Sequence, residues 1–136
     1  MSKKRVHSLR KRIPARTVWG DVVGYSRAVR TGGIIAVSGT APSDEHGSVV
    51  GKDDAYAQTV FVIKKIEKAL NDLGARLDDV VRTRIYTTDI GRGKQIAKAH
   101  QEFFGTIKPA NTMVQVNRLI DPDMLVEIEM DAIVEQ

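Results

Sequence analysis

One stretch shows the organisation of this chain most clearly, Leu125-Val126-Glu127-Ile128-Glu129-Met130-Asp131-Ala132-Ile133. Successive side chains of a strand point to opposite faces of a sheet, so this alternation predicts a strand with one apolar and one acidic face. The apolar face carries Val126, Ile128, Met130 and Ala132. The other face carries Leu125, Glu127, Glu129, Asp131 and Ile133. We expect the apolar face to cover a core and the acidic face to meet solvent or a partner.

Four more strands are predicted upstream. Residues 26–29 and 34–38 flank Arg30-Thr31-Gly32-Gly33, a polar connection typical of a hairpin turn. Residues 80–88 are rich in β-branched side chains and alternate. Their two predicted faces are Val81, Thr83 and Ile85 against Arg82, Arg84 and Tyr86. Residues 112–119 form a strand that a turn around Pro122 joins to the last one, and we expect these two strands to pair as a terminal hairpin.

Two helices lie between these strands. From Asp53 to Gly74 the apolar side chains recur every three or four residues, which predicts a helix with one buried stripe. Asp53 or Asp54 can accept hydrogen bonds from the free amides at its start, and Gly74 can take the left-handed conformation at its end. Residues 94–104 predict a second, shorter helix. The order ββαβαββ indicates an α+β fold with two helices on one face of a mixed sheet.

Composition limits the classes of protein that this chain can represent. Its 136 residues suffice for one core, but burial in so short a chain is incomplete and association would help. The chain has no cysteine, which excludes disulfides, thiolate metal sites and a cysteine nucleophile. No apolar run approaches the ~18 residues of a membrane span. We expect a cytoplasmic protein that does not engage a membrane.

The basic residues gather at the start of the chain. Residues 1–20 hold seven lysines and arginines and no acid, whereas the rest holds 14 basic and 17 acidic residues. We therefore divide the chain into a basic N-terminal arm, 1–20, and a single domain, 21–136. Clustered positive charge can bind nucleic acid. The arm lacks the aromatic side chains on which bases stack, so we favour a solvated, partly disordered tail over a nucleic-acid contact.

Several short motifs appear in a fixed order along the domain. They are Gly24-Tyr25-Ser26-Arg27, Val37-Ser38-Gly39, Gln58, Phe103-Phe104-Gly105, Pro109-Ala110 and Val126-Glu127-Ile128-Glu129. In this order the chain resembles the RidA (YjgF) family from about Gly24 to Ile133. The resemblance implies a chorismate-mutase-like fold, a homotrimer, and small-molecule clefts between neighbouring subunits. Characterised members of the family hydrolyse reactive enamines and imines.

The resemblance also implies site residues. Glu127 matches the glutamate that positions the attacking water, so we predict it as the catalytic residue. Tyr25, Ser38, Asn111 and Thr112 are the predicted ligand-binding residues. Each has a simpler interpretation: Ser38 as a hydroxyl that bonds local backbone, and Tyr25 as an ordinary strand aromatic. We expect Glu129 and Asp131 only to pair with Arg82 and Arg84 across the sheet.

Residue 111 departs from the family pattern. Deaminating relatives have an arginine there, whose planar fork holds a substrate carboxylate by two charge-assisted hydrogen bonds. Asn111 cannot form these two bonds, so it should weaken the binding of a carboxylate by at least ~1 kcal/mol. His100, Met113 and Ala97 also differ from the residues common in relatives. These departures predict an uncharged or amide-bearing ligand.

Three functions remain open from the sequence. The first is a divergent enamine or imine deaminase, a hydrolase. The second is a non-catalytic protein that binds a metabolite and regulates a partner. The third, which we favour least, is RNA binding or ribonuclease activity. We expect no cofactor and no metal, because His7, His46 and His100 are far apart and have no ligand spacing.

Overall fold

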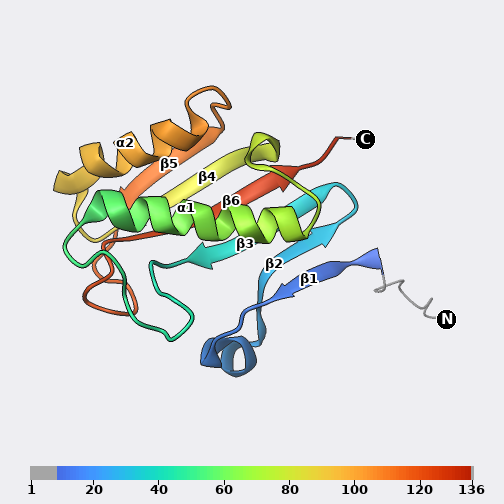
Figure 1. The fold of residues 1–136 in the computed structure, drawn as a ribbon, viewed down its shortest axis with the longest axis horizontal. Helices are drawn as coiled ribbons and strands as arrows, with labels where there is room; N and C mark the ends of the chain where they lie inside the picture. The colour runs from blue at the N-terminus through green and yellow to red at the C-terminus, as the bar shows by residue number, and fades with distance from the viewer. Residues whose placement is uncertain (1–8, 136) are drawn as a thin grey trace.

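The computed structural model describes residues 9–135, which form one mixed sheet with helices on one face (Figure 1). The strands are β1 (Lys11–Pro14), β2 (Ser26–Thr31), β3 (Ile34–Thr40), β4 (Val80–Thr87), β5 (Ala110–Gln115) and β6 (Val126–Ile133). The α-helices are α1 (Ala55–Asp72) and α2 (Gly93–Phe104). The described residues also contain the short helical turns η2 (Gly20–Gly24), η3 (Leu77–Asp79) and η4 (Ile90–Arg92). The predicted α+β class with two helices on one face is confirmed.

The strand order across the sheet is β1-β2-β3-β6-β4-β5. The predicted hairpin of the last two strands is wrong, because β5 pairs with β4 in parallel and β6 lies between β3 and β4. Helix α2 forms the crossover that a parallel pair requires. The connection from Gln115 to Val126 is then long enough to carry the chain past β4 to the centre of the sheet. Glu127 therefore stands on a central strand.

Strand β1 lies inside the region that we expected to be a basic tail. It pairs antiparallel with β2, with Lys11 opposite Arg30 and Ile13 opposite Ala28. Ile13 packs against the core, which gives this short edge strand its anchor. Pro14 sits at its end, where no ladder hydrogen bond from its nitrogen is needed. The sheet thus begins before residue 21, and three of the basic residues of the arm, Lys3, Lys4 and Arg5, lie outside the described residues.

Helix α1 supplies most of the core on the covered face of the sheet. Its buried stripe packs on β3 and β6, and it includes Val62, Ile63, Ile66 and Leu70. The Asp54 carboxylate caps its start by accepting the Ala57 amide at 2.9 Å. Gly74 ends the helix with a φ of 78°. Both predicted helix signals are confirmed.

The apolar face of β6 is buried, as its alternation predicted. In β4 one predicted position is wrong, because Val81 is 43% exposed whereas Thr83 and Ile85 are buried. The pairing with β6 shifts register between Val80 and Arg82, and this irregularity turns Val81 outward.

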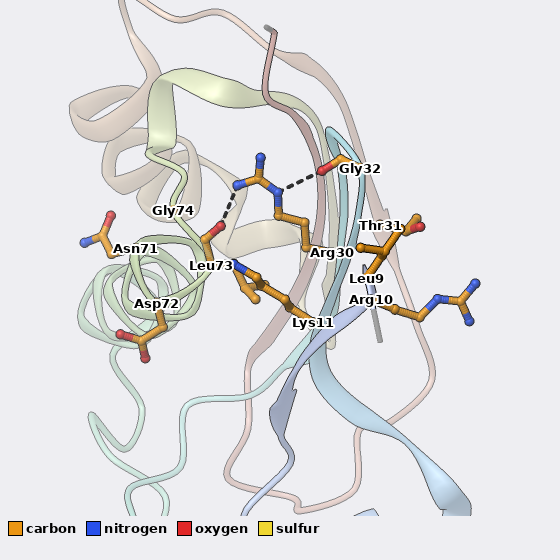
Figure 2. Close-up of a pocket in the computed structure, with 10 residues that line it drawn as sticks. All are labelled: Leu9, Arg10, Lys11, Arg30, Thr31, Gly32, Asn71, Asp72, Leu73 and Gly74. Carbon is orange, nitrogen blue, oxygen red and sulfur yellow. Dashed lines mark hydrogen bonds between the residues drawn. The ribbon is translucent and has the colours of Figure 1, made fainter. Parts of the chain in front are cut away.

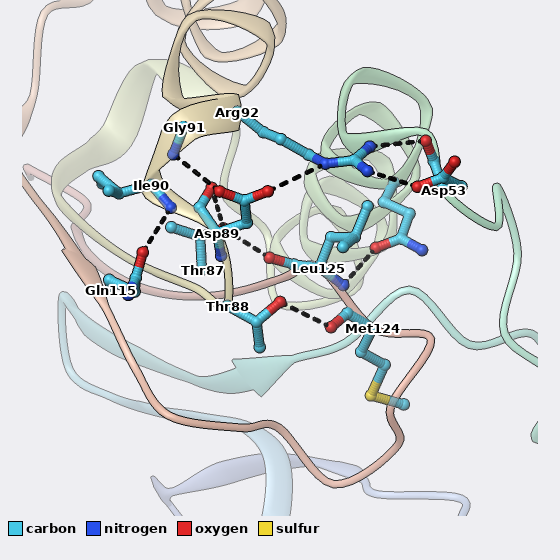
Figure 3. A network of polar contacts seen from close by, with 11 residues as sticks. Asp53, Thr87, Thr88, Asp89, Ile90, Gly91, Arg92, Gln115, Met124 and Leu125 are labelled. Carbon is cyan, nitrogen blue, oxygen red and sulfur yellow. Dashed lines mark hydrogen bonds and ion pairs between the residues drawn. The ribbon is translucent and has the colours of Figure 1, made fainter.

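Hydrogen bonds fix the turn that leads into β6. The buried side chain of Gln58 donates to the Asp123 carbonyl at 2.9 Å and accepts the Leu125 amide at 2.8 Å. Thr87 donates its hydroxyl to the Leu125 carbonyl at 2.7 Å. Figure 3 shows how Arg92 adds to this end of the sheet by linking Asp53, at the start of α1, to Asp89 after β4. These contacts hold the strand that carries Glu127 in a fixed position.

No helix in residues 9–135 is long and apolar enough to cross a membrane.

Candidate functional site

The candidate site begins with an irregularity in β3. Val37 pairs with Met130 and Thr40 with Ile128, so Ser38 and Gly39 together oppose the single residue Glu129. Such a β-bulge re-aims side chains and is common beside functional sites. Here it brings the backbone of Gly39 against the carboxylate of Glu127. A Cβ atom built on Gly39 would overlap Glu127 Oε2 and would lie 3.2 Å from Glu127 Cδ.

Glu127 is the one acid of its strand face whose carboxylate forms no hydrogen bond or ion pair with residues 9–135. Tyr86 donates its hydroxyl to Glu129. Asp131 pairs with Arg84 at 3.1 Å and lies 3.9 Å from Arg82. The predicted pairing of the arginines is thus confirmed for Asp131, whereas Glu129 bonds a tyrosine instead.

Burial raises the pKa of the Glu127 carboxyl, nearby Arg27 lowers it by a smaller amount, and Glu129 adds to the increase. No hydrogen bond from residues 9–135 contributes. A half-buried carboxyl with a raised pKa can both accept and return a proton near neutral pH.

Glu127 lines a cleft of about 1610 Å³ at the end of the sheet where β2, β3 and β6 meet the surrounding loops. Tyr25 and Ser38 line the same cleft. Ser38 donates its hydroxyl to the Ser26 carbonyl at 2.6 Å, as the simpler interpretation of this residue predicted. The lining also includes exposed apolar side chains, namely Trp19 and Val23 from the turn before β2 and Ile120.

Two cations that line the cleft are partly or fully buried. Arg27 of β2 is only 8% exposed, and one of its terminal nitrogens donates to the Gly39 carbonyl. Burial lowers the pKa of Arg27, while Tyr25 and Glu127 raise it. Lys65 of α1 donates to the Ser43 carbonyl at 3.0 Å, and burial followed by the charge of Arg27 lowers the pKa of its amine, while Asp44 raises it. Arg27 is therefore the buried cation that acts on Glu127 by charge.

Asn111 and Thr112 lie elsewhere in the single chain. They stand on the edge strand β5, which β4 separates from β6, and neither lines the cleft of Glu127. The Asn111 amide donates to the Thr83 hydroxyl at 2.8 Å, and that hydroxyl also lies 3.0 Å from His100 Nε2. Burial lowers the pKa of His100. One chain thus unites Tyr25, Ser38 and Glu127, and the ligand-binding role of the two β5 residues stays a prediction.

A second cleft, of about 870 Å³, lies between β1, β2 and the end of α1 (Figure 2). Its central cation is already engaged: Arg30 donates to the carbonyls of Gly32, at 2.9 Å, and Leu73, at 2.6 Å. The bond to Leu73 satisfies a carbonyl at the end of α1, and the bond to Gly32 holds the turn between β2 and β3. We therefore assign this cleft a structural role.

Residues 9–135 contain no group of three or more histidine, cysteine or acidic side chains that could hold a metal ion. The described part of the cleft offers a carboxylate, hydroxyls and cations. This set suits proton transfer and the binding of a polar organic molecule.

Comparison with known proteins agrees with the fold. The family model described as endoribonuclease L-PSP matches residues 19–134. The chain belongs to the RidA/YjgF family. A RutC family protein of Pyrococcus abyssi is 37% identical over 105 residues, which cover 77% of this chain and 82% of that protein.

Two solved structures show how closely the RidA/YjgF fold is kept. A Mycobacterium tuberculosis member of the YjgF/YER057c/UK114 family is 46% identical, with a TM-score of 0.83, and the match covers 92% of this chain and 99% of that one. The Escherichia coli YjgF gene product is 25% identical, with a TM-score of 0.79 and the same two shares of coverage.

No role for Arg27, Lys65 or Gly39 was predicted from the sequence. Arg27 had a visible signal, since it is a charged residue inside a predicted strand, directly after Tyr25 and Ser26. Lys65 had none, because it lies on the polar side of a helix next to Lys64. Gly39 was noted only as the neighbour of Ser38.

Proposed function

We propose that this protein is a hydrolase of the enamine and imine deaminase type and that Glu127 is its catalytic residue. The observation that carries this proposal is the carboxylate itself. It is half-buried and has a raised pKa. It bonds no group of residues 9–135, and it faces a cleft at a strand bulge. The other two acids on its strand face are held by Tyr86 and by arginines.

The proposed reaction needs only water and proton transfers. An enamine first takes a proton on carbon and loses one from nitrogen, which gives the imine. Water then adds to the imine carbon: its oxygen forms the new bond, and Glu127 takes one proton from the water and returns it to the nitrogen. In the resulting carbinolamine the hydroxyl proton passes to the nitrogen through Glu127, the carbon–nitrogen bond breaks, ammonia leaves, and the carbonyl forms. General acid–base help of this kind typically contributes about 10²- to 10⁴-fold in rate.

The homotrimer is part of this proposal. The open side of the sheet and its ends carry exposed apolar side chains, including Ile34, Val81, Val114 and Ile133, which association would cover. In a trimer with clefts between subunits, Asn111 and Thr112 of one subunit would approach Glu127 of the next. These two residues then contribute to the site only in the assembled protein.

The test is hydrolysis of imines that an amino-acid oxidase generates in situ, followed in competition with a chemical trap for the imine. The wild-type protein should accelerate hydrolysis, and Glu127→Gln should lower the rate by about 10²-fold or more. Glu129→Gln is the matched control, because it lies on the same strand face but bonds Tyr86. Equal loss in both variants, or no acceleration by the wild type, would refute the proposal.

A non-catalytic binding protein is the second candidate, because Arg27 and Lys65 of the cleft could hold a polar ligand without any reaction. Binding of a small molecule without turnover by the wild-type protein would support this alternative.

A further inference from the structure

We infer that Arg27 determines ligand specificity by binding an anionic group, a carboxylate, in the cleft that holds Glu127. This inference rests on the proposed function only in that it concerns the same cleft. It replaces the expectation of an uncharged ligand, which was based on the missing arginine at position 111.

The first argument is the unused hydrogen-bonding capacity of Arg27. A guanidinium has five N–H donors. Within residues 9–135 the side chain of Arg27 donates to one partner, the Gly39 carbonyl. Its Nε atom is buried without any partner. A buried cation with most of its donors unpaired costs stability, and such a group calls for an explanation. A bound anion would supply the missing acceptors.

Position is the second support. Arg27 is more than nine-tenths buried, and it lines the same cleft as Glu127. The two side chains attract each other by charge, yet no salt bridge joins them within residues 9–135. A ligand in this cleft can therefore present a carboxylate to Arg27 and a reacting carbon to Glu127.

A second cation near Arg27 is the third support. The charge of Arg27 lowers the pKa of the Lys65 amine, after burial, while Asp44 raises it. Arg27 and Lys65 both line the cleft and repel each other. An anion bound at Arg27 would offset this repulsion.

The test compares two ligands that differ only in charge, 4-methyl-2-oxopentanoate and its amide, by titration calorimetry at neutral pH. Their branched side chain can contact the apolar lining residues Trp19, Val23 and Ile120. The wild-type protein should bind the acid about tenfold more tightly than the amide, since a hydrogen bond to a charged group exceeds a neutral one by about that factor. Arg27→Gln should reduce this preference to about twofold or less.

Two further variants make the result specific. Arg118→Gln changes an exposed arginine of the same cleft, and it should leave the acid preference unchanged. Glu127→Gln removes a like charge, so it should strengthen acid binding about threefold relative to the amide. If Arg27→Gln does not fold, judged by circular dichroism and urea unfolding, the Glu127→Gln ratio decides, and an unchanged ratio overturns the inference.

Equal affinity of the wild type for acid and amide, no binding of either, or an acid preference that survives in folded Arg27→Gln would each overturn the inference. These outcomes are distinct from failure of the proposed function. Acid binding that depends on Arg27, in a wild-type protein that turns over no imine, would uphold the role of Arg27 and refute the hydrolase.

Discussion

A single methyl group on Gly39 should displace the Glu127 carboxylate without removing it. In Gly39→Ala the new Cβ would overlap Glu127 Oε2, the end of a flexible side chain, and no other residue lies among its three nearest atoms. Gly39 does not have positive φ, so alanine fits its backbone. The side chain of Glu127 must therefore move and the strand need not.

The size of this movement sets the expected effect. Ordinary van der Waals contact requires a shift of roughly 1 Å in the carboxylate, and a misplacement of that size can cost about 100-fold in rate. The imine hydrolysis assay should show this loss in kcat, while the free energy of unfolding changes by less than about 1 kcal/mol.

A matched control is Gly93→Ala at the start of α2. Its Cβ would meet only the Met113 sulfur at 3.7 Å, an ordinary contact far from the cleft, so activity should stay at the wild-type value. Full activity of Gly39→Ala, with Glu127→Gln inactive, would show that the position of the carboxylate against the bulge does not matter. A large loss of stability in Gly39→Ala would show that the strand had to move.

Three further predictions follow from the same contacts. Glu127→Gln should be more stable than the wild type at pH 7 in urea unfolding, because the raised pKa of Glu127 means that the wild type loses stability as pH rises through that pKa. The difference in the free energy of unfolding should vanish below about pH 4, and lower stability of the variant at pH 7 would contradict the prediction. Gln58→Leu leaves the Asp123 carbonyl and the Leu125 amide unpaired, so it should lower the free energy of unfolding by about 2 kcal/mol or more and also reduce activity, whereas exposed Gln101→Leu should do neither. The mass in solution should be three times the 15.0 kDa of the chain, and a monomer or dimer would refute the trimer.

Local sequence patterns predicted the elements whose side chains alternate or recur strongly. The stripe of α1 and the two faces of β6 are such patterns, and both are confirmed. Strand pairing was harder to predict, because the sequence of residues 112–119 does not indicate whether this strand pairs with β4 or with β6. Strand β1 was not predicted, because two of its four residues are charged and only Ile13 packs against the core.

The candidate site was predictable in part for a similar reason. Tyr25, Ser38 and Glu127 came from motifs, and the structure places them in one cleft. The ligand charge was predicted from residue 111 alone. Arg27 lies on another strand, and the sequence around Asn111 gives no sign that this arginine lines the same cleft as Glu127. Only the fold shows that Arg27 and Glu127 are neighbours.

The most direct test of Glu127 as the working group of the cleft is a pH titration of its side-chain carboxyl carbon by NMR, with Glu127→Gln to assign the signal. The structure predicts a midpoint above the ordinary glutamate value of about 4.3. A midpoint at or below that value would mean that the carboxylate is well solvated or paired, and the account of this cleft would be wrong.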